Sequence, residues 1–187
     1  MAPNSNENEI LNIPNIITLC RLILVPMCVY LILESRLTAA LFVFALAGVS
    51  DGIDGFLARY LNQKTALGAF LDPLADKMLL VSSFITLSLK GFIPFWLTLV
   101  VVARDTMILS GILRLWLSGI RFEIKPRVLS KLTTFLQLVS VFLTLLFADA
   151  FHVEQARSIA FVATFFFTLF SGIEYLIVGL KIVRNNN

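Results

Sequence analysis

The sequence predicts an all-α integral membrane protein with six transmembrane helices and a polar cavity that faces the cytoplasm. Of its 187 residues, 58% are hydrophobic and only 14% are charged, whereas soluble domains average about 45–50% and about 25%. Mostly apolar runs of roughly 18 or more residues recur, each long enough to cross a bilayer as a helix. A transmembrane barrel would instead show short alternating segments.

The apolar runs occupy one expected domain at residues 16–184, between a polar arm at 1–15 and a tail at 185–187. The arm has acidic residues but no Lys or Arg, so it lacks the positive segment of a cleaved signal peptide. The fourth run is long enough to be tilted in the membrane. The six expected spans are Ile16–Leu33, Leu37–Ala58, Phe70–Leu89, Phe92–Ser118, Val128–Ala148 and Ser158–Leu180.

Basic residues between the runs predict the orientation. One side of the membrane has Arg59, Lys64, Arg121, Lys125, Arg127, Lys131, Lys181 and Arg184, and the other has Arg36, Lys90 and Arg157. Cytoplasmic loops carry an excess of Lys and Arg. We therefore expect both termini, and the loops after the second and fourth spans, to lie in the cytoplasm, with a bacterial inner membrane as the expected location.

Most charged residues inside the expected spans fall at a similar depth, in the cytoplasmic half. They are Arg21, Asp51, Asp54, Asp72, Asp76 and Lys77. Arg104 and Asp105 lie in the middle of the fourth span, and Arg114 lies nearer the cytoplasm. Charged side chains at membrane depth are costly and usually face a bundle interior or a wet cavity. The sequence therefore predicts one polar cavity open to the cytoplasm.

The four aspartates form two pairs, each on one helix face. Asp51 and Asp54 are three residues apart, Asp72 and Asp76 are four apart, and a short loop joins their helices. Carboxylates that converge in a partly dry site repel one another, and two divalent cations would neutralise four of them. A set of ligands made only of oxygen atoms suits Mg²⁺ or Mn²⁺. Two such metal ions close together are typical of enzymes that transfer phosphoryl groups. A structural alternative is that these aspartates form ion pairs that fix helix packing.

The segment Ser50–Lys77 reads SDGIDGFLARYLNQKTALGAFLDPLADK and resembles the signature of the CDP-alcohol phosphotransferase family. The residues that carry the resemblance are Asp51, Asp54, Gly55, Ala58, Arg59, Gly68, Asp72 and Asp76. The resemblance implies a six-helix membrane core in which an alcohol attacks the β-phosphorus of a CDP-linked lipid and releases CMP. It also implies two metal ions on the four aspartates and Asp76 as the general base. Gly55, Ala58, Arg59 and Gly68 would form the cytidine nucleotide pocket.

The opening NIPNIITLCR is similar to an element of the phosphatidylglycerol branch of that family. Asn15, Thr18 and Arg21 are three residues apart and share one helix face. We expect Asn15 and Thr18 to contact the CDP group and Arg21 to contact a phosphate. For Asn15 a helix N-cap is the alternative.

Residues of the fourth and fifth spans are candidates for binding the acceptor or its phosphate. They are Arg104, Asp105, Arg114, Arg127 and Lys131, in addition to Arg21. Contact with anionic lipid headgroups is the alternative for the neighbouring cations Arg121 and Lys125, and it explains Arg104 poorly.

The resemblance leaves two acceptors open for a CDP-diacylglycerol donor. VVARDTMIL, which contains Arg104 and Asp105, is similar to cardiolipin synthases and favours phosphatidylglycerol. SGIEY, at Ser171–Tyr175, is similar to phosphatidylglycerophosphate synthases and indicates glycerol 3-phosphate. The resemblance also implies a homodimer, and we expect no nucleic-acid partner. A cation-coupled transporter and an inactive scaffold of the same fold are the other classes of protein that the pattern leaves open.

Overall fold

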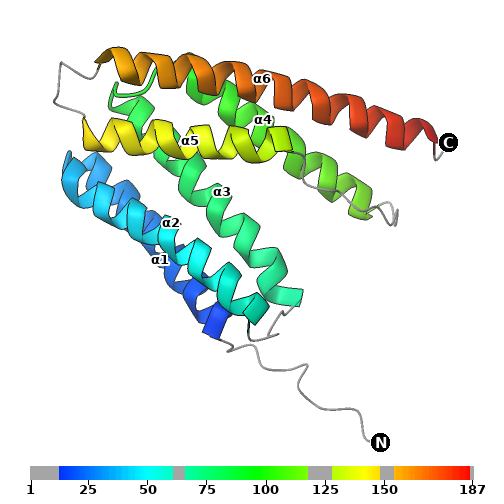
Figure 1. The fold of residues 1–187 in the computed structure, drawn as a ribbon, viewed down its shortest axis with the longest axis horizontal. Helices are drawn as coiled ribbons and strands as arrows, with labels where there is room; N and C mark the ends of the chain where they lie inside the picture. The colour runs from blue at the N-terminus through cyan, green and yellow to red at the C-terminus, as the bar shows by residue number, and fades with distance from the viewer. Residues whose placement is uncertain (1–12, 61–65, 118–127, 148–153, 186–187) are drawn as a thin grey trace, which may run out of the picture. The chain divides into compact units, whose positions relative to one another are not determined.

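The computed structural model describes an all-α chain, as the sequence predicts (Figure 1). Its described residues are 13–60, 66–117, 128–147 and 154–185, and its described side chains exclude those of 13–16, 51–60, 66–73, 112–117 and 178–185. The helices are α1 (Ile13–Leu33), α2 (Leu37–Tyr60), α3 (Ala66–Leu89), α4 (Phe95–Leu117), α5 (Val128–Leu146) and α6 (Glu154–Asn185).

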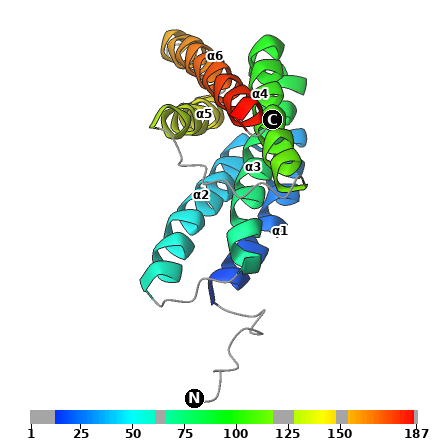
Figure 2. The same ribbon diagram turned by 90° about the vertical axis from the view of Figure 1, so that its right-hand side faces the viewer.

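The helices group into two compact units, Met1–Thr86 and Leu87–Asn187. In the first unit α1 packs along α2, and α3 reaches α1 through a side-chain ion pair. In the second unit α6 packs against both α4 and α5, as Figure 2 also shows. That all six helices form one domain stays a prediction.

Several helix ends differ from the predicted spans, among them the beginnings of α3, α4 and α6. Helix α3 begins at Ala66 instead of Phe70, and α6 begins at Glu154 instead of Ser158. An acidic residue such as Glu154 is favourable in the first turn, where the helix dipole is positive. Helix α4 begins only at Phe95 because Pro94 precedes it and accepts the first helical hydrogen bonds on its carbonyl oxygen.

Helices α1 and α3 end in the same type of tight turn. In the first, the Arg36 N–H donates to the Leu31 carbonyl at 2.9 Å, and Ser35 has a φ of 59°. In the second, the Phe92 N–H donates to the Leu87 carbonyl at 2.9 Å, and Gly91 has a φ of 80°. Both patterns are Schellman caps, which satisfy the last carbonyls of a helix and require one residue in the left-handed region.

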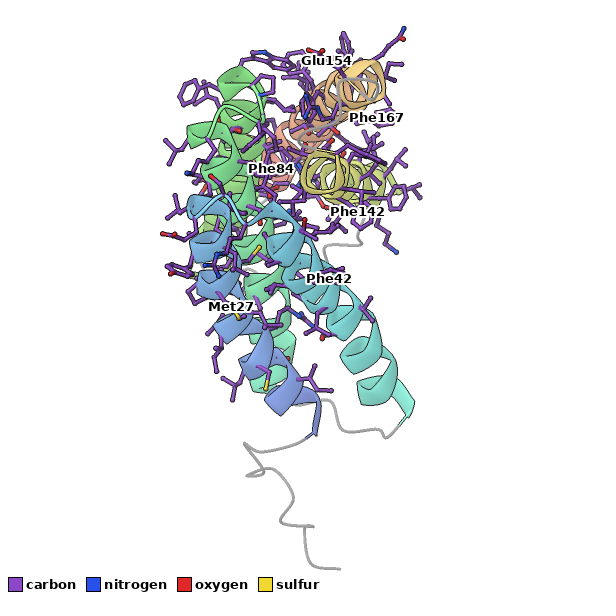
Figure 3. The ribbon with its side chains drawn as sticks, turned by 90° about the vertical axis from the view of Figure 1, so that its left-hand side faces the viewer. Met27, Phe42, Phe84, Phe142, Glu154 and Phe167 are labelled. Carbon is purple, nitrogen blue, oxygen red and sulfur yellow. The ribbon has the colours of Figure 1, made fainter. Side chains whose placement is uncertain are left out.

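Two described helices are long and apolar enough to cross a membrane alone: α5 and the Glu154–Ile177 part of α6. Shorter apolar stretches occupy Ile17–Leu33 of α1 and Leu37–Ser50 of α2. Many large apolar side chains point outward, among them Phe42 on α2 and Phe142 on α5 (Figure 3). Six transmembrane spans and a cytoplasmic cavity stay predictions.

Candidate functional site

An ion pair between α1 and α3 marks the candidate catalytic region of the first unit. Nη1 of Arg21 donates to Oδ1 of Asp76 at 3.0 Å. The Arg21 side chain is 0% exposed, whereas that of Asp76 is 40% exposed. A guanidinium this deeply buried needs a nearby negative charge. Arg21 therefore holds one oxygen of the Asp76 carboxylate, and the Asp76 side chain remains partly exposed.

Helix spacing explains why the sequence brings these two residues to one place. Thr18 lies one turn before Arg21 on the same face of α1, and both are buried. Ala75, next to Asp76 on α3, is fully buried, so the apolar neighbour holds this turn against the rest of the unit. The predicted common depth of Arg21 and Asp76 is consistent with their direct contact.

The other predicted donor-site residues lie on the helices, but their side chains are outside the described set. Asp51, Asp54, Gly55, Ala58 and Arg59 belong to the last turns of α2. Gly68 and Asp72 belong to the first turns of α3, and Asn15 lies at the beginning of α1. Because both segments are helical, the spacings of three and four residues keep each aspartate pair on one face. Convergence of the two pairs stays a prediction.

The residues fit a hard divalent cation by their donor chemistry. Asp76 is the one predicted ligand with a described side chain, and it presents a partly exposed carboxylate. Carboxylate oxygens are the ligands that Mg²⁺ and Mn²⁺ prefer. Among the described side chains no three His, Cys, Asp or Glu residues gather at one point, but this set excludes three of the four aspartates.

A second buried cluster centres on Arg104 in the second unit. Its Nη1 donates to Oδ1 of Asp105 at 2.6 Å, and its Nη2 donates to Oγ of Ser130 and Oγ of Ser171, both at 2.8 Å. The ring of Tyr175 lies 5.7 Å from Cζ of Arg104. These contacts connect α4, α5 and α6, so the predicted acceptor residues Arg104 and Asp105 also hold the unit together.

The remaining predicted acceptor residues are not part of this cluster as far as the structure describes them. Lys131 is exposed on α5, whereas Arg104 is buried on α4. Arg114 lies on α4 without a described side chain, and Arg127 lies outside the described residues. The basic patch that the sequence suggested around Arg104 therefore stays a prediction.

Sequence reasoning missed a row of buried polar residues between α5 and α6, which we call the polar seam. Its members are Thr133, Gln137, Ser140 and Thr144 on α5, and Thr164, Thr168 and Ser171 on α6, all 0% exposed. Ser140 and Thr164 share a hydrogen bond of 2.8 Å, and Thr133 donates to the Phe167 carbonyl at 3.1 Å. Their repeat at intervals of four and three residues is the signal that could have revealed them.

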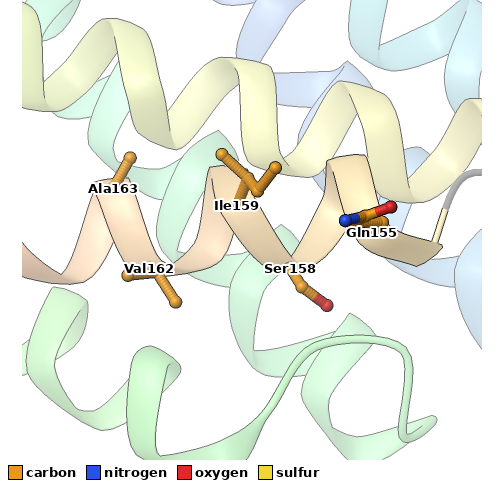
Figure 4. A pocket seen from close by; sticks show the side chains of 5 residues that line it. All are labelled: Gln155, Ser158, Ile159, Val162 and Ala163. Carbon is orange, nitrogen blue, oxygen red and sulfur yellow. The ribbon is translucent and has the colours of Figure 1, made fainter.

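A depression of about 400 Å³ on the outer side of α6 does not belong to either cluster (Figure 4). It is lined by Gln155, Ser158, Ile159, Val162 and Ala163, none of them charged. This surface therefore offers no charged group to a phosphate.

Comparisons with known proteins identify the family of the chain. Residues 11–170 match the CDP-alcohol phosphatidyltransferase family, and the chain belongs to this family of membrane-bound transferases of phospholipid biosynthesis. It is 35% identical to the cardiolipin synthase (CMP-forming) of Rattus norvegicus over 98% of this chain and 66% of that protein. It is 34% identical to a probable phosphatidylglycerophosphate synthase of Mycobacterium tuberculosis over 92% of this chain and 84% of that protein.

A further relative covers less of the chain at higher identity. The cardiolipin synthase (CMP-forming) of Streptomyces coelicolor is 44% identical over 57% of this chain and 54% of that protein. The chain thus spans just under two thirds of the rat protein and about half of the Streptomyces protein. The named relatives divide between cardiolipin synthases and a probable phosphatidylglycerophosphate synthase.

Proposed function

We propose that this chain transfers a phosphatidyl group from CDP-diacylglycerol to the hydroxyl of a glycerol-type alcohol and releases CMP. The observation that carries the proposal is the family match, which extends from residue 11 to residue 170 and includes all four aspartates. The contact of Asp76 with Arg21 supports it, because a carboxylate with one oxygen fixed is suited to accept a proton in a defined direction.

In the proposed reaction the acceptor oxygen forms a bond to the β-phosphorus, and the bond from this phosphorus to the oxygen of CMP breaks. CMP leaves with the bonding electron pair, and the hydroxyl proton passes to the Asp76 carboxylate. Asp51, Asp54, Asp72 and Asp76 would hold two Mg²⁺ or Mn²⁺ ions, which when bound neutralise charge on the pyrophosphate. Arg21 would orient Asp76, in addition to the phosphate contact that the sequence suggested.

The other site assignments follow the sequence motifs. Gly55, Ala58, Arg59 and Gly68 would surround the cytidine nucleotide, together with Asn15 and Thr18. Arg21, Arg104, Asp105, Arg114, Arg127 and Lys131 would serve the acceptor and the phosphates. Among these, burial of Arg104 beside two hydroxyl groups supports a polar site within the second unit.

For the acceptor we favour phosphatidylglycerol, which would make the chain a cardiolipin synthase. The Arg104–Asp105 motif and the rat and Streptomyces relatives support this choice. Glycerol 3-phosphate is the second candidate, supported by the Ser171–Tyr175 motif and the Mycobacterium tuberculosis relative. We further propose a homodimer with six transmembrane spans in a bacterial inner membrane and an active site that faces the cytoplasm.

The test is CMP release by the purified full chain in detergent with CDP-diacylglycerol, Mg²⁺ or Mn²⁺, and one acceptor at a time. We expect release with phosphatidylglycerol and its loss in EDTA, in Asp72→Asn and in Asp76→Asn. Faster release with glycerol 3-phosphate would select the other acceptor. If no alcohol gives CMP while a cation gradient drives uptake into liposomes, the chain is a transporter and the proposal is wrong.

A further inference from the structure

Gln137 is a fully buried amide whose hydrogen-bonding groups are not matched by its protein surroundings. It is 0% exposed in the middle of α5. Neither its Oε1 nor its Nε2 has a hydrogen-bond partner among the residues that the structure describes. A primary amide offers two donors and an acceptor with two lone pairs. Each buried polar group without a partner costs about 1–3 kcal/mol, so such groups are rare in native proteins.

A second unmatched group, the Thr168 hydroxyl, lies on the facing helix. Thr168 is also 0% exposed, and its Oγ1 has no partner among the described residues. Helical spacing places Gln137 between Thr133 and Ser140 on one face of α5. In the same way it places Thr168 between Thr164 and Ser171 on one face of α6. Each unmatched group therefore shares a helix face with residues that make hydrogen bonds across the seam.

Two hydrogen bonds fix this register of α5 against α6. Thr133 Oγ1 donates to the Phe167 carbonyl, and Thr164 Oγ1 donates to the Leu136 carbonyl, both at 3.1 Å. Leu136 and Phe167 are the chain neighbours of Gln137 and Thr168. These bonds place Gln137 beside Thr164 and Thr168 beside Thr133, so the unmatched amide and hydroxyl lie about one helical turn apart along the polar seam.

One end of the seam is the Arg104 cluster. Ser130 and Ser171, which accept from Arg104, lie on the helices that carry Gln137 and Thr168. Ser130 precedes Gln137 by seven residues, or about 10 Å of helix. Nε of Arg104 is buried and has no partner among the described residues. The seam therefore combines a donor that suits an anion with neutral groups that suit a hydroxyl.

We propose that Gln137 and Thr168 form a buried binding site for a hydroxyl group. One hydroxyl can donate to the amide oxygen and accept from the amide nitrogen, and Thr168 can complete its hydrogen bonds. Two sources have this chemistry: a resident water molecule, or a hydroxyl of the glycerol moiety of the acceptor. The second source rests on the proposed function, since it requires a glycerol-type acceptor.

The test uses two substitutions that remove the polar groups and keep the volume. Gln137→Leu and Thr168→Val are compared with wild type, and Gln137→Met serves if the leucine variant does not fold. Matched controls are Gln155→Leu, at an exposed glutamine, and Thr144→Val, at a buried threonine that donates to the Ser140 carbonyl at 2.7 Å. Each purified full-length variant is assayed for the temperature of half-unfolding and for the KM of phosphatidylglycerol, glycerol 3-phosphate and CDP-diacylglycerol.

If an acceptor hydroxyl binds here, both variants raise the KM of that acceptor about five- to tenfold, the loss expected for one hydrogen bond, with the KM of CDP-diacylglycerol unchanged. If water binds here, the KM values stay constant and Gln137→Leu lowers the unfolding temperature by about 2–4 °C. An unfolding temperature that is unchanged or higher, with constant KM values, overturns the proposal. If wild type releases no CMP with any acceptor, the proposed function fails, and the unfolding temperatures still decide whether the site exists.

Discussion

The contact between Arg21 and Asp76 permits a quantitative test of the candidate catalytic region. Replacing Arg21 by Met keeps a long apolar chain on α1 but removes the donor that lies 3.0 Å from Asp76 Oδ1. A hydrogen bond to a charged group contributes about 1.5–3 kcal/mol. Because the Asp76 side chain is 40% exposed, solvent screening reduces this contribution, and we expect a coupling of about 1–2 kcal/mol.

The measurement is a double-mutant cycle of Arg21→Met and Asp76→Asn, by thermal unfolding in EDTA so that metal binding does not contribute. Coupling of this size means that the two single variants together lose about 2–8 °C more than the double variant does. Arg36→Met, at an exposed arginine of the same unit, is the matched control. Losses that add within about 0.5 kcal/mol would show that the pair does not contribute to the fold in solution.

Kinetics separate the two roles considered for Arg21. If it orients Asp76, Arg21→Met lowers kcat about 10- to 100-fold and leaves the KM of CDP-diacylglycerol within about twofold, because a displaced base mainly affects the chemical step. A raised KM for CDP-diacylglycerol with normal kcat would instead indicate contact with the donor phosphates, and the orienting role would be refuted.

Three further predictions concern other parts of the chain. Arg104→Met breaks a buried ion pair and should destabilise the protein by about 3–5 kcal/mol, whereas the double variant with Asp105→Leu should recover much of this loss in thermal unfolding. Gly91→Ala should lower the unfolding temperature by about 2–4 °C because φ is positive there, whereas Gly111→Ala, within α4 and with open space around it, should raise it. Mg²⁺ or Mn²⁺ should raise the unfolding temperature of wild type but not of Asp72→Asn, since a ligand that binds only the folded state stabilises it.

The helices could be predicted from the sequence because apolar runs of this length rarely adopt any other secondary structure. The beginning of α6 at Glu154 was not predicted, because polar residues continue this helix beyond the apolar run. The donor motif was recognised from the identity and spacing of its residues and their resemblance to a known family, and the structure adds that Arg21 contacts its last aspartate. That contact depends on how α1 packs against α3, which the local pattern of neither helix specifies.

The polar seam escaped prediction for a different reason. Serine and threonine inside an apolar helix bond to the carbonyl one turn earlier, as Thr144 does with Ser140, so they carry little signal on their own. Gln137 differs because its amide cannot be satisfied in this way as readily. A glutamine within an apolar run that is flanked by threonine and serine at helical spacing would have been the feature to examine.

The distance along the chain between Arg21 and Asp76 has a consequence for biosynthesis. The two residues are 55 positions apart, so at about 5–20 residues per second α1 is made roughly 3–11 s before its carboxylate partner emerges. An arginine without a counter-charge is costly in hydrocarbon and tends to stay near the headgroups. The Arg21–Asp76 contact can therefore form only after the chain has been made as far as α3, which places it late in the assembly of the first unit.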